Sequence, residues 1–258
     1  MASFQNSPFS YGGATSATRS QVEVDQGLRA FMLGVYNNMV LGLAISGLVA
    51  FGTNMLAVTQ NAAGRIALTP LGQALYVSPL KWVVMLAPLA FIFFFSFRMD
   101  RMSAASARTT FLAFAAVMGL SLSTLLVVFK LGSIVQVFFI TAAAFGALSL
   151  YGYTTQRSLS GMGSFLIMGL IGLILASLVN IFLASSALQF AISLIGVLIF
   201  AGLTAYDTQK LKEMYLYELG TPDGEVAAKA SIFGALTLYL DFINMFQFLL
   251  SLMGSRNE

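Results

Sequence analysis

Long stretches without a charged side chain constrain the fold of this chain more than any other feature of its sequence. The segment from Ser158 to Tyr206 contains no Asp, Glu, Lys or Arg. A helix needs about 20 apolar residues to cross the hydrocarbon core of a bilayer, so this segment is too long for one span and about right for two. The small, polar stretch Ala184–Ala187 is the expected turn between them.

Five further apolar runs predict five further membrane spans. They cover Phe31–Thr53, Trp82–Phe97, Thr109–Phe129, Leu131–Gln156 and Ala230–Ser255. The sequence therefore predicts an all-α integral membrane protein with seven transmembrane helices.

These spans divide the chain into two regions. Residues 1–29 are polar and are expected to form an N-terminal cytoplasmic tail, flexible from Met1 to about Gln21. Residues 30–255 are expected to form a single transmembrane domain. Its longest expected loop is Asn54–Pro79.

The composition agrees with a membrane protein and narrows the chemistry that the chain can perform. Charged residues make up 9% of the chain, whereas a soluble domain carries about a quarter. The absence of Cys and His excludes disulfides, thiol nucleophiles and zinc sites of the Cys/His type. A bound metal would have to be a hard cation held by oxygen atoms, and no cofactor is expected. The sequence has no cluster of basic residues interleaved with aromatic residues, so binding to nucleic acid is not expected.

The distribution of Lys and Arg predicts the orientation in the membrane, because cytoplasmic loops carry an excess of these residues. Nine basic residues lie on the side of the N-terminus, and four lie on the other side. The first group is Arg19, Arg29, Arg98, Arg101, Arg108, Arg157, Lys210, Lys212 and Lys229; the second is Arg65, Lys81, Lys130 and Arg256. The N-terminus is therefore expected in the cytoplasm and the C-terminus on the opposite side.

Two acidic residues lie within the predicted spans, where ionisable side chains are rare and mark a function by default. Asp207 ends the sixth span, and Asp241 lies in the middle of the seventh. Helical spacing places Asp241 on a polar stripe with Thr237 and Asn244, extended by Gly234 and Ser251. A structural role for each aspartate, as a hydrogen-bond acceptor for a neighbouring helix or as a solvated charge at a helix end, is the alternative.

If the sixth and seventh spans pack together, the two carboxyl groups can meet in a medium of low dielectric constant. Two such groups cannot both ionise cheaply, so they are expected to share a proton and to titrate as a unit. From the span limits Asp207 lies near the interface and Asp241 nearer the midplane. Contact therefore requires the seventh span to start deeper or the sixth to run longer.

An arginine is a candidate partner for this pair. Arg98 closes the second span on the same side of the membrane as Asp207 and could form an ion pair that acts as a latch. Protonation of Asp207 would release this latch, and a cation could then pass Asp207 and Asp241 in turn. Alternatively, Arg98 is one member of a positive-inside cluster with Arg101 and Arg108.

The segments "FAGLTAYDTQKLKEMY" and "ALTLYLDFINMF" resemble the bacterial branch of the Bax inhibitor-1 family, as does the N-terminal "VDQGLRAFMLGVYNNMVLGL". The resemblance covers the chain from about Val22. It implies a seven-helix bundle in the bacterial inner membrane whose last helix is enclosed by the other six. It also implies a pH-sensitive calcium leak gated by an aspartate pair, which matches Asp207 and Asp241, with Arg98 at the position of the latch.

Two other functions remain open from the sequence. Some bacterial relatives are thought to modulate a membrane-bound protease, so the chain could be a non-transporting regulator that binds membrane proteins through its polar tail. A buried aspartate pair is also compatible with an intramembrane aspartyl protease. Those proteases carry a motif of the Gly-Leu-Gly-Asp type, which this chain lacks, and an enzyme is therefore not expected.

Overall fold

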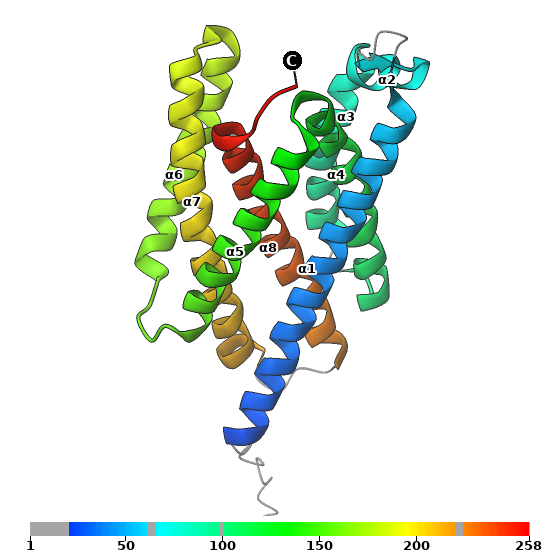
Figure 1. The fold of residues 1–258 in the computed structure, drawn as a ribbon. Helices are drawn as coiled ribbons and strands as arrows, with labels where there is room; N and C mark the ends of the chain where they lie inside the picture. Colours follow the sequence, from blue (N-terminus) through cyan, green and yellow to red (C-terminus); the bar gives the residue numbers. More distant parts are fainter. Residues whose placement is uncertain (1–20, 61–65, 99–100, 220–223, 258) are drawn as a thin grey trace, which may run out of the picture.

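The computed structural model describes residues 21–60, 66–98, 101–219 and 224–257. It shows a bundle of helices in which α1 begins at one end and the C-terminus lies at the opposite end (Figure 1). The segment predicted to be flexible, Met1 to about Gln21, lies outside the described residues except for Gln21.

Eight α-helices, one π-helical turn and one antiparallel pair of short strands form the regular structure of the described residues. In chain order the elements are α1 (Gln21–Ala57), β1 (Val58–Gln60), β2 (Ile66–Leu68), α2 (Pro70–Tyr76), α3 (Leu80–Arg98), α4 (Ala104–Val128), α5 (Leu131–Thr154), α6 (Ser160–Leu183), α7 (Ser186–Glu213), a π-helical turn η2 (Met214–Glu218) and α8 (Gly224–Met253).

Six of these helices, α1 and α4 to α8, are long and apolar enough to cross a membrane by themselves. The helices α2 and α3 meet the same criterion only together, and they are bent by 59° at the break between them. The described chain therefore has six membrane-spanning helices, or seven if the bent pair forms one span. The expectation of an all-α membrane protein is confirmed.

Two regions differ from the sequence-based prediction. Helix α1 begins at Gln21, so the last residues of the expected tail are already helical. The expected loop Asn54–Pro79 contains the antiparallel pair β1–β2 and the short helix α2. Helix α2 starts where Thr69 caps it by accepting a hydrogen bond from the Gly72 amide at 3.2 Å, with Pro70 at the first helical position, where its missing N–H is not needed.

The predicted turn between the fifth and sixth spans is confirmed. Helix α6 ends at Leu183, and Ala184 adopts a left-handed conformation with φ of 48°. The side chain of Ser185 then caps α7 by accepting a hydrogen bond from the Leu188 amide at 3.3 Å. The small residues of this stretch thus reverse the chain in two residues.

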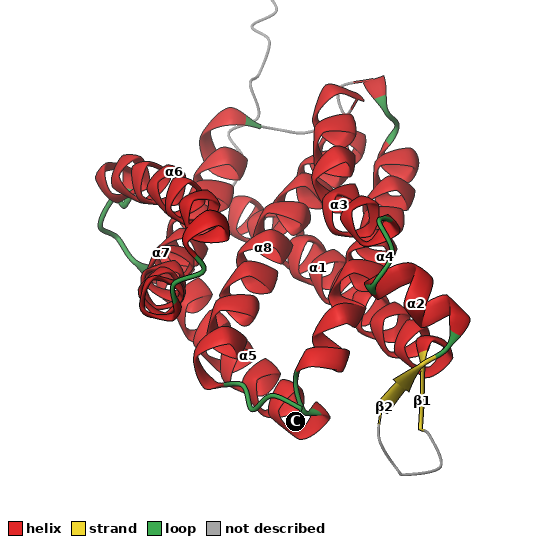
Figure 2. Ribbon diagram, turned by 90° about the horizontal axis from the view of Figure 1, so that it is seen from above, coloured by secondary structure: helices red, strands yellow, loops and turns green. Residues whose placement is uncertain are grey.

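Helix α8 is the most buried of the spanning helices. It packs against α1, α4, α5 and α7, and Figure 2 shows it between the α1–α4 pair and the α5–α7 pair. The expectation that all six other helices enclose α8 is not confirmed, because α3 and α6 are not among the helices that pack closely against it.

The contact between α1 and α4 depends on a glycine. A Cβ atom at Gly119 of α4 would lie 2.5 Å from the carbonyl oxygen of Ser46 on α1. Ser46 itself donates a hydrogen bond to the Ala115 carbonyl on α4 at 2.7 Å and shares another with the hydroxyl of Tyr239 on α8, also at 2.7 Å. Small residues thus let α1, α4 and α8 approach closely enough for hydrogen bonds between helices.

Replacing Gly119 by Val should therefore destabilise the bundle. The added side chain meets backbone atoms of α1, and such overpacking costs about 1–3 kcal/mol. The matched control is Gly172→Val on α6, where a Cβ atom would meet nothing within 4 Å. Thermal unfolding in detergent measures both variants, and equal effects would contradict the role of this contact.

Candidate ion site between α7 and α8

Both helices that carry the acidic residues extend further than the apolar runs predict. Helix α7 continues through Asp207 to Glu213, so Asp207 lies inside the helix and not at its end. Helix α8 begins at Gly224, before the expected start at Ala230. These extensions place Asp207 and Asp241 at the same level, which the span limits alone left open.

The side chains of Asp207 and Asp241 face each other across the α7–α8 contact. Their carboxyl groups lie within hydrogen-bonding reach of each other. Asp241 is only 4% exposed, and its Oδ2 atom is buried without a hydrogen-bond donor among the described residues. An unpartnered buried carboxylate oxygen is costly, so this contact needs a proton or a cation to compensate it.

The two aspartates line a common cavity of about 620 Å³. Leu89 of α3 and apolar residues of α6 form one side of it, and α7 and α8 form the other. Helix α3 packs on α2 and α4, whereas α6 packs on α7. The cavity therefore occupies the space where α3 and α6 do not meet.

The charged and titratable side chains that line this cavity are Tyr206, Asp207 and Lys210 of α7 and Asp241 of α8. The lining residues of α3 and α6 are apolar except for Ser177. Lys210 lies one helical turn after Asp207, and its positive charge acts on the Asp207 carboxyl group. It is the only cation among the described residues that line the cavity.

The predicted Arg98–Asp207 ion pair is not present between these two described residues. Arg98 is exposed at the end of α3, and its guanidinium lies 5.7 Å from the ring centre of Phe94 one turn earlier. The cation that acts on Asp207 in this structure is Lys210, on the neighbouring turn of α7. The role of Arg98 as a latch stays a prediction.

The predicted polar stripe of α8 divides between two environments. Thr237 and Asn244 line the cavity beside Asp241. Each donates a hydrogen bond to the backbone of its own helix, Thr237 to Phe233 at 3.2 Å and Asn244 to Leu240 at 2.8 Å. The amide oxygen of Asn244 takes no part in that bond and is left for other partners in the cavity.

Gly234 and Ser251, the two ends of this stripe, hold α8 against α7. A Cβ atom at Gly234 would lie 2.8 Å from the Leu211 side chain of α7. Ser251 accepts a hydrogen bond from Ser193 of α7 at 3.0 Å. These contacts on either side of the pair fix the spacing of the two helices where the carboxyl groups meet.

Two parts of the cavity wall, those from α6 and α3, could not be predicted from the sequence. The wall from α6 consists of lipid-compatible residues such as Leu170 and Leu173, which look like any other membrane-facing residues. Leu89 of α3 is equally inconspicuous. Lys210 does have a signal, because its separation of three residues from Asp207 places the two on one face of a helix.

A family model described as "Inhibitor of apoptosis-promoting Bax1" matches residues 28–258. The chain belongs to this family, the Bax inhibitor-1 family. The resemblance of the motifs around Asp207 and Asp241 is thereby confirmed.

Bacterial relatives of the family match nearly the whole chain. An uncharacterized protein of Caulobacter vibrioides is 46% identical over 248 residues, which cover 96% of this chain and 97% of the relative. Protein RP147 of Rickettsia prowazekii is 44% identical and covers 96% of this chain and 99% of its own. The inner membrane protein YbhL of Escherichia coli K12 is 44% identical over 239 residues, with 92% and 96% covered.

The contact between the carboxyl groups predicts the effect of neutralising one of them. Asp241→Asn should stabilise the protein at pH 8, because it removes a like charge and its amide can donate to the Asp207 carboxylate. A hydrogen bond to a charged group contributes about 1.5 kcal/mol. Thermal unfolding in detergent at pH 8 measures the change.

The control for this variant is Glu225→Gln, which removes an exposed acid from the first turn of the same helix. An acid at this position interacts favourably with the helix dipole, so its removal should lower the stability slightly. Asp241→Ala removes the carboxyl group without replacing it. If Asp241→Asn lost as much stability as Asp241→Ala, the proposed contact with Asp207 would be contradicted.

Proposed function

We propose that this membrane protein is a passive, proton-regulated cation leak whose cargo is Ca²⁺. The observation that supports it most strongly is the buried contact between Asp207 and Asp241 within a cavity that contains one cationic lining residue, Lys210. Acidic side chains inside a membrane domain are expensive, and they mark ion and proton pathways more often than other functions.

A shared proton accounts for the unpartnered Oδ2 atom of Asp241. A proton held between the two carboxyl groups supplies the donor that this oxygen lacks, and it removes the repulsion between two neighbouring negative charges. When the proton leaves, the pair needs another positive charge. Lys210 is exposed and offers only a screened interaction, so a cation from solution is the stronger candidate.

The chemistry of the cavity favours a hard cation such as Ca²⁺. Carboxylates and amide oxygens are the ligands that Ca²⁺ prefers, and Asp207, Asp241 and Asn244 supply both kinds. Ca²⁺ takes six to eight oxygen ligands, more than these side chains provide, so water would complete the shell. An incomplete protein shell suits an ion that passes through and is not retained.

The finer topology belongs to the same proposal. We take α2 and α3 as one bent span, which gives seven spans with the N-terminus in the cytoplasm and the C-terminus in the periplasm. The excess of Lys and Arg on the side where α1 begins supports this orientation. We also propose a non-enzymatic role, because the residues around Asp207 and Asp241 lack the protease motif that such a pair would need.

Ion flux into liposomes across pH 5 to 8, with a calcium dye inside, tests the proposal. We expect flux that depends on pH in the unaltered protein and a flat profile in Asp207→Asn and in Asp241→Asn, because neither variant retains a pair that can share a proton. Glu225→Gln is the control and should keep the original profile. The absence of flux at every pH would contradict the leak function. A pH dependence that survives in both variants would contradict the role of the aspartate pair.

A second comparison separates the two candidate counter-charges. Lys210→Gln should move the pH profile to higher pH, because the ionised pair loses a favourable charge. The shift should be less than about one pH unit, since Lys210 is exposed and its interaction is screened. Arg98→Gln should leave the pH profile unchanged. A shift in Arg98→Gln without a shift in Lys210→Gln would instead support Arg98 as the latch.

A further inference from the structure

An apolar groove of about 990 Å³ runs between α1 and α5, away from the acidic pair. Phe242 of α8 forms its floor, and it neighbours a second apolar hollow that contacts Ile243 and Phe246. With 100° of rotation per residue, these three residues lie on the face of α8 opposite to Asp241 and Asn244. The groove is therefore separate from the candidate ion site.

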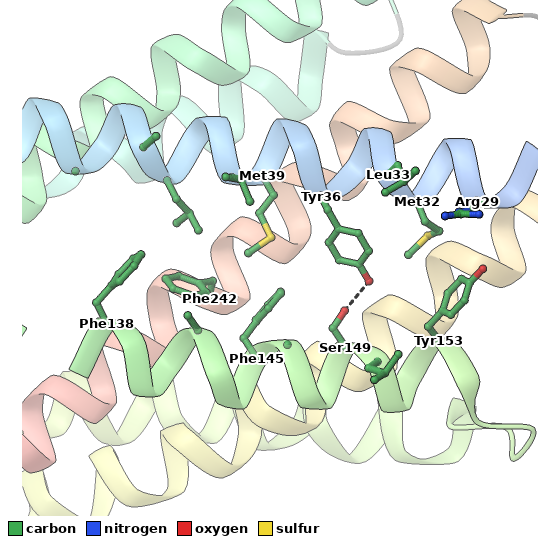
Figure 3. A pocket seen from close by; sticks show the side chains of 17 residues that line it. Arg29, Met32, Leu33, Tyr36, Met39, Phe138, Phe145, Ser149, Tyr153 and Phe242 are labelled. Carbon is green, nitrogen blue, oxygen red and sulfur yellow. Dashed lines mark hydrogen bonds between the residues drawn. The ribbon is translucent and has the colours of Figure 1, made fainter. Parts of the chain in front are cut away.

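The groove opens sideways, toward the lipid. Helix α1 packs on α4 and α8, whereas α5 packs on α7 and α8. A hydrogen bond of 2.7 Å between the hydroxyls of Tyr36 and Ser149 bridges the two helices (Figure 3). Two lining residues, Val40 and Leu150, are 61% and 63% exposed.

The polar residues that line the groove lie from its middle, at Tyr36 and Ser149, to one end. Arg29 and Tyr153 lie at the end nearest the start of α1, whereas Phe138 lies at the other end (Figure 3). A second cation adjoins this polar end. Lys212 donates a hydrogen bond to the Tyr153 carbonyl at 2.9 Å, and its Nζ lies 5.5 Å from the centre of the Tyr153 ring.

The length of the groove matches the membrane. Its lining residues on α1 run from Arg29 to Gly47, which corresponds to about 27 Å at 1.5 Å per residue. The hydrocarbon core of a bilayer is about 30 Å thick. The groove thus offers an apolar channel for a hydrocarbon chain and a basic site at the depth of the headgroups.

We propose that this groove binds a membrane phospholipid with an anionic headgroup. Its phosphate lies at Arg29 and Lys212, and an acyl chain runs along α1 and α5 over Phe145 and Phe242. A helix of a partner protein is about 10 Å across and could not enter without breaking the Tyr36–Ser149 bond. An acyl chain is narrow enough to lie beside that bond.

Quenching of tryptophan fluorescence by brominated lipids tests this proposal, because the chain has a single tryptophan, Trp82. In a Trp82→Phe background, Phe145→Trp reports the groove, and Ile171→Trp, on the exposed face near the middle of α6, reports bulk lipid. The apparent affinity of the groove should be about fivefold higher for brominated phosphatidylglycerol than for brominated phosphatidylcholine. A difference of this size corresponds to the attraction of about one basic residue for an anionic headgroup. At position 171 the two lipids should quench equally.

Arg29→Gln should weaken this preference at position 145, where Lys212 remains, and leave position 171 unchanged. Equal quenching by both lipids at position 145 before that substitution would overturn the proposal, as would no quenching there by either. The test requires no leak activity, so its result is independent of the proposed function.

Native mass spectrometry of the protein with its natural aromatic residues provides a second measurement that does not depend on the new tryptophan. Gly146 lines the groove, and a Cβ atom there would meet nothing within 4 Å. Gly146→Leu should therefore fill the groove without a clash and lose bound phosphatidylglycerol. Gly172→Leu, on α6, should keep it; retention of the lipid by both variants contradicts the assignment.

Discussion

The contact between the carboxyl groups of Asp207 and Asp241 is the interaction on which the candidate site depends. Two acidic groups that meet inside a membrane domain repel each other unless a proton or a cation lies between them. The bundle therefore has to hold α7 and α8 together by other contacts on both sides of the pair. Gly234 against Leu211 and Ser251 against Ser193 supply those contacts, so the surrounding packing sustains an arrangement that is unfavourable in itself.

Helix α8 combines two different environments because its opposite faces meet different neighbours. One face carries Asp241 and Asn244 into the cavity beside α7, and the other carries Phe242 and Phe246 toward the gap between α1 and α5. Tyr239 lies on this second face, where it is fully buried and shares a hydrogen bond with Ser46 of α1. Helix α8 packs against α1, α4, α5 and α7. This central position of α8 explains why one helix can contribute both to a polar site and to the floor of an apolar groove.

Most of the helical architecture could be predicted from the sequence, because apolar length alone defines a membrane span. The turn at Ala184 and the inward face of Asp241 also followed from local patterns. The ends of α7 and α8 could not be predicted from hydropathy, because the helices continue into polar sequence such as Gly224–Lys229, and these ends decide whether the two aspartates meet. The hairpin β1–β2 and helix α2 were missed for a related reason: segments this short lack the periodicity on which such predictions rest.

The identity of the counter-charge shows a second limit. Arg98 and Lys210 are both expected on the same side of the membrane as Asp207, and many other basic residues are expected there too. The spacing of three residues between Asp207 and Lys210 favours Lys210, and the structure distinguishes the two residues, since Arg98 lies over Phe94 whereas Lys210 lines the cavity.

Infrared difference spectroscopy of the carboxyl groups as the pH is raised tests the central claim most directly. If the two aspartates share one proton, the unaltered protein shows one band of a protonated carboxyl group that disappears in a single step. Asp207→Asn and Asp241→Asn should then each shift or abolish that same band. Two separate bands, each removed by only one of the variants, would contradict the shared proton and with it the account of the site.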